Sequence, residues 1–508
     1  MSAAVSPAPA VAAALNPRRR RSLVGLSAVT ALVWVTASDI SIALPTIGRH
    51  LGGSMDVLQW AVNGYFLAGS LIIVGGRLAD LFGRRLLFAI GTLMLLSGSV
   101  VAGLAGSPTM LILGRVLQGA GAAAILPAAL AIIAVEFPPA ERTGAIGVWI
   151  ATCWGAQALG PLVGGVLVAA LGWTAIFWVN LPLGIAALWL AWTSTPESSS
   201  GEAERHIDVP GLVTLVGGLF LLNFALVEAD EISGSRLALY LGGAVLLIGA
   251  FILIERRVRS PLVALSVFRG RAFNGAVLAN LIANIVFGAV VFFMALYLQV
   301  ALGHSALVTG ALLLPATLPI LALTPVGARW ARRAGPGIPI LAGMVLLLIA
   351  GLLLTTMPAS YGVLVIPFVI LGAGIGLQIT ATAEVAVDEG SGAGEGVASG
   401  VYKAASMIGG SLGVAASVTI FQSSARTHFQ DALGAVHATG DQLGQMLAVL
   451  TGALRPAVLD GLLGTRTQQV VEDTFRAAVG NAMWLLVAAA AVGILTSWLL
   501  LVRDRPRR

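Results

Sequence analysis

The chain has 508 residues, of which 58% are hydrophobic and only 10% carry a charge. Soluble globular proteins carry about 25% charged residues, so this composition excludes an ordinary soluble domain and predicts a protein that crosses a membrane many times. The formal net charge is +6, but the arginines are spread over short loops, which favours a topology signal over a nucleic-acid-binding patch. The single cysteine, Cys153, excludes an intrachain disulfide, and the five histidines form no ligand-spaced cluster, so no metal site is predicted.

Apolar runs recur along the chain. The first 22 residues, rich in alanine and proline and basic at their end, are predicted to form a disordered cytoplasmic N-terminus. At about 20 apolar residues per span, the remainder predicts fourteen transmembrane helices and an all-α polytopic membrane fold. Their approximate limits are 23–44, 57–76, 86–105, 108–135, 143–170, 173–193, 210–228, 236–254, 272–300, 305–328, 337–356, 361–384, 396–421 and 475–502.

The arginines indicate how these helices are oriented. An even number of spans puts both ends of the chain on one side, and most arginines fall in the short loops and ends on that side. Because short loops with an excess of Lys and Arg face the cytoplasm, both termini are predicted to be cytoplasmic. The protein would then be a multi-pass protein of the bacterial cell membrane.

Residues 75–85 read Gly-Gly-Arg-Leu-Ala-Asp-Leu-Phe-Gly-Arg-Arg and lie between the second and third predicted helices. Glycines allow a tight turn, and the arginines place it at the cytoplasmic face. The segment resembles the signature loop of the major facilitator superfamily, with Leu81 where that pattern has arginine. The resemblance implies a transporter in which Asp80 bonds to a neighbouring helix start or arginine; a simple anchored turn is the alternative. The implied conformational gate consists of Gly76, Asp80, Gly83, Arg84 and Arg85.

The resemblance also implies two six-helix halves, and the extra pair of helices would be inserted between them. The outer loop at 422–473 is unusually long, and its apolar residues at helical spacing predict an extracellular helical hairpin or a pair of interfacial helices. The predicted parts are the N-terminus at 1–22, the N-terminal half at 23–193, the linkers and inserted helices at 194–271, the C-terminal half at 272–502 and a basic cytoplasmic tail at 503–508.

Arg115 lies inside the fourth predicted helix, where a charged side chain normally faces the protein interior and has a partner. Residues 115–121 resemble the second motif of the superfamily, Arg-x-x-Gln-Gly-x-Gly. Asp39 in the first helix is the predicted partner, because helix geometry puts both residues about 9 to 10 Å below the outer face. A carboxyl group releases its proton more readily beside a cation, so making and breaking this pair could couple transport to protons. A static salt bridge is the alternative.

The fifth predicted helix carries small residues and a proline at regular positions. Glycines four residues apart let another helix approach closely, and a proline kinks a helix, so the segment could be purely structural. It resembles the antiporter motif of exporters, and with fourteen helices the chain resembles the drug:proton antiporter, or multidrug efflux, branch. That branch often has its first-helix acid at the position of Thr36, one turn before Asp39. The motif residues are Gly155, Gly160, Pro161, Gly164 and Gly165.

Polar and aromatic residues within the predicted helices could together line a central substrate cavity. Each one alone is more often a helix–helix hydrogen bond or a packing residue. Lys403 could hold an anionic group of a substrate, pair with Glu384 or Asp388, or extend to the interface. The candidate cavity residues are Trp34, Asn63, Tyr65, Gln118, Gln157, Asn284, Phe292, Gln378 and Lys403.

The predicted function is proton-coupled efflux of amphipathic or hydrophobic small molecules across the bacterial plasma membrane by alternating access. No Gly-x-x-x-x-Gly-Lys-Ser/Thr sequence is present, so neither ATP use nor an enzyme is predicted, and protons would be the coupling ion without a cofactor. The expected partners are a small-molecule substrate and the lipid bilayer, not nucleic acid, and the chain is expected to be a monomer. The alternatives are a dedicated exporter of one metabolite, antibiotic or lipid, possibly anionic, and a non-transporting scaffold or receptor.

Overall fold

The computed structural model describes most of the chain. The described residues are almost entirely helical, and they contain no strand. Fourteen helices within them are long and apolar enough to cross a membrane, which confirms the predicted all-α polytopic fold. The described ranges are 16–52, 55–198, 208–228, 232–258, 261–263, 265–358, 361–390, 395–433, 439–452 and 454–503.

Three of the fourteen candidate membrane crossings are interrupted and consist of two helices each. These are α3 with α4, α8 with α9, and α13 with α14. Shorter 3-10 and π-helical segments cover Leu265–Arg269, Tyr297–Ala301, Pro456–Leu459, Gly464–Arg466 and Trp498–Val502. The α-helices are α2 (Pro17–Leu51), α3 (Met55–Gly69), α4 (Ile72–Phe82), α5 (Arg84–Gly103), α6 (Pro108–Glu136), α7 (Pro139–Leu171), α8 (Ala175–Trp178), α9 (Asn180–Ser194), α10 (Val209–Val227), α11 (Gly234–Glu255), α12 (Arg271–Leu296), α13 (Ala306–Leu312), α14 (Leu314–Ala334), α15 (Gly337–Thr355), α16 (Tyr361–Gly390), α17 (Glu395–Leu433), α18 (Gly440–Leu450), α19 (Asp460–Leu463) and α20 (Thr467–Ser497).

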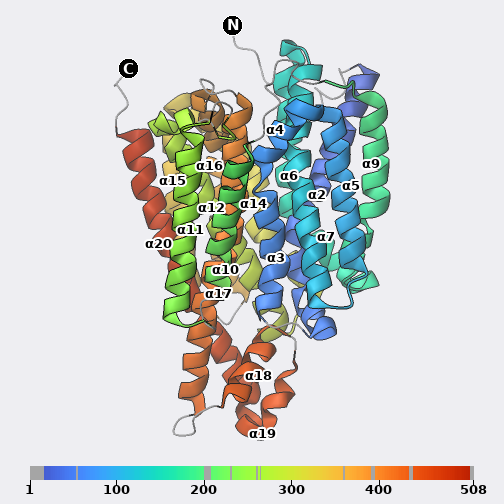
Figure 1. Ribbon diagram of the computed structural model, residues 1–508. Helices are drawn as coiled ribbons and strands as arrows, with labels where there is room; N and C mark the ends of the chain where they lie inside the picture. Colours follow the sequence, from blue (N-terminus) through green and yellow to red (C-terminus); the bar gives the residue numbers. More distant parts are fainter. Residues whose placement is uncertain are drawn as a thin grey trace.

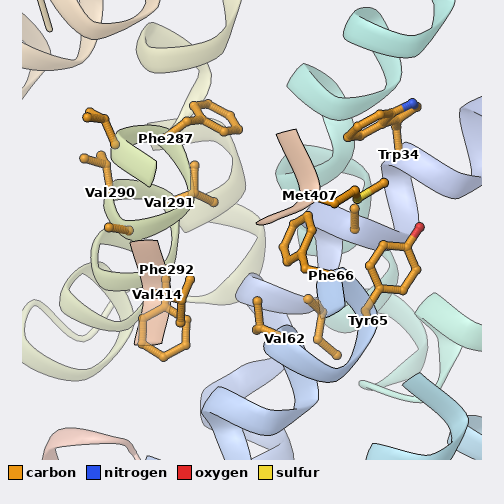
Figure 2. Packing of buried hydrophobic residues seen from close by; sticks show 14 of the residues in the cluster. Trp34, Val62, Tyr65, Phe66, Phe287, Val290, Val291, Phe292, Met407 and Val414 are labelled. Carbon is orange, nitrogen blue, oxygen red and sulfur yellow. The ribbon is translucent and has the colours of Figure 1, made fainter. Parts of the chain in front are cut away.

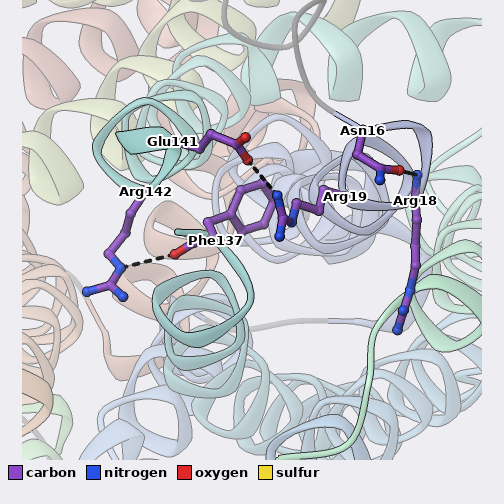
Figure 3. A network of polar contacts seen from close by, with 6 residues as sticks. All are labelled: Asn16, Arg18, Arg19, Phe137, Glu141 and Arg142. Carbon is purple, nitrogen blue, oxygen red and sulfur yellow. Dashed lines mark hydrogen bonds and ion pairs between the residues drawn. The ribbon is translucent and has the colours of Figure 1, made fainter. Parts of the chain in front are cut away.

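The first helix begins earlier than predicted. Residues 17–22 belong to α2, although the sequence predicted that all of residues 1–22 are disordered; residues 1–15 lie outside the described part. The side chain of Asn16 caps the helix by accepting a hydrogen bond of 3.1 Å from the backbone N–H of Arg18. Arg19 forms an ion pair of 3.2 Å with Glu141 of α7 (Figure 3). A cap and a tertiary contact therefore extend the helix beyond its apolar run.

Two groups of helices lie side by side in Figure 1, with α2–α9 in blue to teal and α12–α20 in yellow to red. The two groups meet where α2 packs against α12, where α3 and α4 pack against α17, and where α7 packs against α13 and α14. The inserted helix α10 packs against both α3 and α17, so it covers one of these contacts between the groups. A site between the two groups would therefore draw on helices of both, among them α2, α3, α4 and α7 on one side and α12, α13, α14 and α17 on the other.

The predicted outer loop at 422–473 is mostly helical. The helix α17 continues to Leu433 and α20 begins at Thr467, so only the segment between them leaves the long helices. That segment holds α18 and α19, which project beyond the bundle in Figure 1. The span prediction ended the helices too early because it followed apolar residues, whereas backbone hydrogen bonding continues outside the apolar layer.

Candidate transport site

Arg115 of α6 is fully buried, and neutral groups surround its charge. Its Nε atom donates to the carbonyl oxygen of Ala61 at 2.8 Å. Its Nη1 atom donates to the carbonyl oxygen of Thr36 at 3.0 Å and to Oε1 of Gln118 at 2.9 Å. The guanidinium lies 4.5 Å from the ring centre of Tyr65, which is a cation–π contact. Its Nη2 atom has no hydrogen-bond partner in the described part of the chain.

A ring of buried hydrogen bonds joins Arg115 to three other helices. Nε2 of Gln118 donates to Oγ of Ser99 in α5 at 2.8 Å. Nδ2 of Asn180 in α9 donates to that same oxygen at 3.2 Å and to Oγ1 of Thr36 at 3.1 Å. Gln118, which was predicted to line the cavity, lies instead in this network with no exposed surface. The network fixes α2, α5, α6 and α9 relative to one another.

The predicted ion pair between Asp39 and Arg115 is not formed in this structure. Both side chains are described and buried, yet no contact between them meets the distance of an ion pair. The reason is that Arg115 directs Nε and Nη1 to the carbonyl groups of Ala61 and Thr36. The carboxyl oxygen Oδ2 of Asp39 has no hydrogen-bond partner among the described residues. Asp39 is therefore a buried acid without a partner for that oxygen.

The antiporter motif of α7 lies directly against Asp39. A Cβ atom added at Gly164 would stand 2.9 Å from Cβ of Asp39, and one added at Gly160 would collide with Oγ of Ser38. Ordinary Cβ contacts are longer, so only glycine lets the two backbones approach this closely. Gly155, in the same motif, would meet nothing within 4 Å. Two of the motif glycines thus create the contact between α7 and α2 at Asp39.

The opposite side of the same motif contacts the C-terminal group of helices. A Cβ atom at Gly165 would stand 2.6 Å from the carbonyl oxygen of Ala306 in α13. A Cβ atom at Gly310 of α13 would stand 2.5 Å from the carbonyl oxygen of Pro161. The motif therefore lies between Asp39 of α2 on one side and α13 of the other group of helices on the other.

The signature loop holds the end of α9. Gly83 separates α4 from α5 with a positive φ of 107°, a conformation that glycine adopts without strain. The backbone N–H of Arg84 donates to the carbonyl oxygen of Ser198 at 3.0 Å, and that of Arg85 donates to Oε1 of Glu197 at 3.1 Å. The guanidinium of Arg85 lies 4.4 Å from the ring centre of Trp192. These contacts stay within the N-terminal group.

Two further residues of the predicted gate are in α4. Asp80 lies in the last turn of this helix, and the predicted bond of its side chain falls outside the described residues. Gly76 faces α6, where an added Cβ atom would stand 3.5 Å from the ring of Pro127, an ordinary contact. The structure thus places the gate residues at the junction of α4, α5, α6 and the segment after α9.

A small cavity of about 10 Å³, room for about one water molecule, lies between α7, α12 and α16. Asn284 and Gln378, both predicted to line a cavity, are among its lining residues. Both polar atoms of the Gln378 side chain are buried and have no hydrogen-bond partner in the described part of the chain. The lining residues are Trp154, Asn280, Ala283, Asn284, Phe287, Ile375, Gln378, Ile379 and Thr382.

Lys403 of α17 is not among the lining residues, but it contacts Trp154, which is, and it is 9% exposed. Its Nζ atom is 5.4 Å from the ring centre of Trp34 and 5.6 Å from that of Trp154. The two indoles are stacked, with centroids 6.3 Å apart and planes inclined by 18°. No ion pair joins Lys403 to Glu384 or Asp388 among the described side chains. Lys403 therefore faces aromatic rings from the opposite group of helices.

The other predicted cavity residues do not line this cavity. Asn63 accepts a hydrogen bond of 3.4 Å from Ser411, at the contact of α3 with α17. The hydroxyl group of Tyr65 donates to the carbonyl oxygen of Val33 at 2.6 Å. Phe292 belongs to the apolar packing shown in Figure 2, and Gln157 is 5% exposed. Asn63 and Tyr65 therefore contribute to contacts between helices.

Sequence reasoning missed several members of the site. Thr382 lines the cavity and exchanges a hydrogen bond of 3.0 Å with the hydroxyl group of Tyr402. Phe287 also lines it, but an apolar residue in an apolar helix carries no distinguishing signal. In the sequence, Ser99 and Asn180 are only isolated polar residues within predicted spans, and nothing there indicates that they share a hydrogen-bond network. Their partners depend on how each helix is rotated, which the sequence does not show.

The fold and the buried polar groups define a class of protein, an all-helical protein with fourteen candidate membrane spans and charged residues buried in its interior. A family model described as the Major Facilitator Superfamily matches residues 24–414. The chain therefore belongs to the Major Facilitator Superfamily. A bacterial homologue of the human lysosomal transporter Spinster has the same fold, with a TM-score of 0.67, 18% identity, and coverage of 97% of this chain and 100% of that chain.

Curated relatives extend the comparison along nearly the whole chain. The tetracenomycin C resistance and export protein of Streptomyces glaucescens is 33% identical over 95% of this chain and 91% of that protein. The puromycin resistance protein of Streptomyces alboniger is 36% identical over 82% of this chain and 84% of that protein. The quinolone resistance protein NorB of Staphylococcus aureus is 30% identical over 78% of this chain and 88% of that protein. The predicted superfamily and its drug-resistance branch are confirmed.

Proposed function

We propose that this chain exports amphipathic or hydrophobic small molecules across the bacterial plasma membrane in exchange for protons, by alternating access. The names of its relatives support export of drug-like compounds, since they specify resistance to tetracenomycin C, puromycin and quinolones. The cavity between α7, α12 and α16 would have to widen during alternating access to admit such a ligand, and its aromatic and amide side chains suit ligands with an apolar body and few polar groups.

Asp39 carries the proposal for proton coupling. Its side chain is 1% exposed, and Oδ2 has no hydrogen-bond partner in the described part of the chain. A charged carboxylate in this place would be unpaired and away from water, which is costly. Asp39 therefore holds a proton in this conformation, and Gly164 keeps the antiporter segment in contact with it.

Arg115 supplies the means to release that proton. Its Nη2 atom is a donor without a partner, and Oδ2 of Asp39 is an acceptor without a partner, both within the described N-terminal helices. Movement of α13 against Gly165 shifts α7 and, through Gly164, the backbone of α2 at Asp39. When the two side chains meet, the ion pair favours the charged carboxylate and the proton leaves. The pair is thus formed in one conformation and broken in the other.

Export of ethidium from cells tests this coupling. The variant Asp39→Asn keeps the size of the side chain but cannot exchange a proton, so efflux that an uncoupler abolishes in the wild type should fall to the background rate. The variant Asp460→Asn, which neutralises an exposed acid in α19, should export ethidium at the wild-type rate. Uncoupler-sensitive efflux at the wild-type rate in Asp39→Asn would reject Asp39 as the proton carrier.

The remaining predictions belong to the same proposal. Both termini face the cytoplasm, as the arginine distribution favours, and the chain works as a monomer with protons as its only coupling ion. The segment from Gly76 to Arg85 acts as the inner gate, because α4, which carries Gly76 and Asp80, also packs against α17 of the other group.

Export of one anionic compound is the second candidate function. Lys403 favours it, because this buried cation contacts Trp154, which lines the cavity, and has no carboxylate partner among the described residues. The two candidates differ in whether a cationic dye such as ethidium is exported at all.

A further inference from the structure

The inserted helix α10 lies across the contact between α3 of one group of helices and α17 of the other. It packs against both α3 and α17, whereas α11 packs mainly against α10. In Figure 1 the three helices α3, α10 and α17 lie next to one another in the half of the bundle from which α18 and α19 project. The inserted pair therefore meets both groups through α10 alone, and the two sides of α10 can be compared.

Hydrogen bonds attach α10 to α17. Oγ of Ser411 donates to Oδ1 of Asn223 at 2.5 Å, and Oγ1 of Thr419 donates to the carbonyl oxygen of Leu226 at 2.6 Å. Leu226 is next to the last residue of α10, and the last carbonyl groups of a helix lack donors within that helix. A carbonyl group without a donor is costly in lipid. Thr419 therefore completes the end of α10 and holds it to α17.

Aromatic rings attach α10 to α3. The ring centroid of Trp60 lies 6.0 Å from that of Phe220 and 6.4 Å from that of Phe224. Such contacts stabilise the packing of two helices, but they can be broken without leaving a polar group unsatisfied. The attachment of α10 to α3 is therefore easier to release than its attachment to α17.

The contact between α3 and α17 leaves polar atoms of α3 unsatisfied. Oγ of Ser411 also lies 3.4 Å from Oδ1 of Asn63, but its single proton serves one acceptor at a time and Asn223 is nearer. Nδ2 of Asn63 and both polar atoms of the Gln59 side chain are buried without a partner in the described part of the chain. Buried polar groups normally have partners. Water would supply these partners when α3 and α17 separate, so another contact must keep the two helices together.

We propose that α10 is a clasp on the contact between α3 and α17. It stays attached to α17 through Asn223 and Leu226 in every conformation, and its ring contacts with Trp60 close the contact here and break when the two groups separate at this end. This inference gives the inserted helix a part in the conformational change. It rests on the alternating access of the proposed function, but on neither protons nor a particular substrate.

Reversible cross-linking tests which side of α10 must be free. The native cysteine, Cys153, is replaced by serine, and a bifunctional thiosulfonate reagent joins pairs of introduced cysteines. Asn223→Cys with Ser411→Cys joins α10 to α17, and this link should leave the rate of ethidium efflux unchanged. Trp60→Cys with Phe220→Cys joins α10 to α3, and this link should stop efflux until a reducing agent removes it. Each rate is compared with that of the same variant before cross-linking.

Three results of the cross-linking would contradict the clasp. Efflux that is stopped only by the link to α17 would mean that α10 moves with α3. Efflux that is stopped by both links would mean that α10 moves relative to both helices. Efflux that neither link changes would mean that the contact between α3 and α17 does not open.

The reactivity of a cysteine buried at this contact tests the clasp without transport. In the purified full chain carrying Cys153→Ser and Asn63→Cys, the rate of alkylation by N-ethylmaleimide reports how often the contact opens. Trp60→Leu removes two aromatic contacts, which bias a two-state equilibrium by about tenfold, so alkylation should become about tenfold faster. Trp60→Phe keeps a ring at this place and should give a smaller increase.

Tyr240 of α11 provides the matched control. Its ring centroid lies 5.2 Å from that of Phe224, so Tyr240→Leu removes an aromatic contact of α10 with α11 and leaves its contacts with α3 in place. The alkylation rate of Asn63→Cys should stay at the value measured without this change. Equal alkylation rates in Trp60→Leu and Tyr240→Leu would overturn the clasp.

Alkylation needs neither a dye nor a pH gradient, so it separates this inference from the proposed function. Faster alkylation in Trp60→Leu, together with proteoliposomes that export no dye under a pH gradient, would support the clasp and reject proton-coupled export. Export driven by a pH gradient, together with unchanged alkylation in Trp60→Leu, would overturn the clasp and leave the proposed function intact.

Discussion

The guanidinium of Arg115 shows how a full charge is stabilised inside the membrane without a carboxylate. Its donors reach the carbonyl oxygens of Ala61 and Thr36 and the amide oxygen of Gln118, and its flat face lies over Tyr65. Each of these partners is a neutral group that presents a partial negative charge to the guanidinium. Asp39 is therefore not needed to hydrogen-bond Arg115. Thr36 contributes its carbonyl oxygen to Arg115 and its hydroxyl oxygen to Asn180.

Gln118 is the residue on which this network depends most, because it both accepts from Arg115 and donates to Ser99. We expect Gln118→Leu to destabilise the protein by about 1–3 kcal/mol, since it leaves buried polar groups without partners. Thermal unfolding in detergent, followed by tryptophan fluorescence, measures the change. The exposed Gln469→Leu in α20 is the control and should stay within about 0.5 kcal/mol of the wild type. Equal stability of the two variants would contradict the importance of the network.

At the scale of helices, α7 connects the acid of one group with the surface of the other. Its Gly164 faces α2, its Gly165 faces α13, and its Pro161 meets Gly310. Small residues on two sides of one helix allow both neighbours to approach closely. The antiporter motif is therefore a packing element that lies beside Asp39. The proposed proton coupling at Asp39 would depend on this packing.

Two glycines of this motif provide a matched comparison. In Gly164→Ala the new methyl group would lie 2.9 Å from Cβ of Asp39, and such overpacking costs about 1–3 kcal/mol. We expect a lower unfolding temperature and slower ethidium efflux. Gly155→Ala meets nothing within 4 Å, and alanine favours a helix over glycine by about 1 kcal/mol, so stability should be unchanged or higher. The packing role would be rejected if both variants transported and unfolded alike.

Considered as a whole, the molecule is asymmetric, because the segment with α18 and α19 covers one end of the bundle. Gly452, at the end of α18, would place a Cβ atom 3.0 Å from Pro45 of α2 and 3.1 Å from Val300. Arg49 also reaches the carbonyl oxygen of Gly452 at 3.5 Å. The projecting segment thus contacts a helix of each group at the same end of the bundle.

Gly452→Ala should loosen this contact. The residue has a positive φ of 77°, a conformation that costs an L-residue about 1–2 kcal/mol, and the added methyl group is crowded by Pro45. Hydrogen exchange of the backbone amides of α18 should become faster than in the wild type. Gly461→Ala in α19, where a Cβ atom meets nothing within 4 Å, should leave exchange in α18 unchanged. Slow exchange in both variants would show that the contact does not hold the segment.

The sequence by itself determined the class of the protein, its fourteen spans and its superfamily. Apolar runs of bilayer length predict helices because each helix satisfies its own backbone hydrogen bonds in lipid. Residues 75–85 indicated the superfamily through their resemblance to its signature loop, but the predicted turn was too long, because α4 runs to Phe82 and only Gly83 separates it from α5. Apolar runs and short motifs are local features, so they can be read along the chain without knowing which helices are neighbours.

Only the tertiary structure decided which side chains meet. Depth in the membrane can be estimated by counting residues from a helix end, and this led to the prediction that Arg115 pairs with Asp39. The direction of a side chain also depends on the rotation of its helix and on its neighbours, and here these turn Arg115 toward Thr36 and Ala61. Lys403 likewise meets Trp34 and Trp154 only because three distant helices pack together. Contacts between helices are set by packing over the whole bundle, which no single stretch of sequence contains.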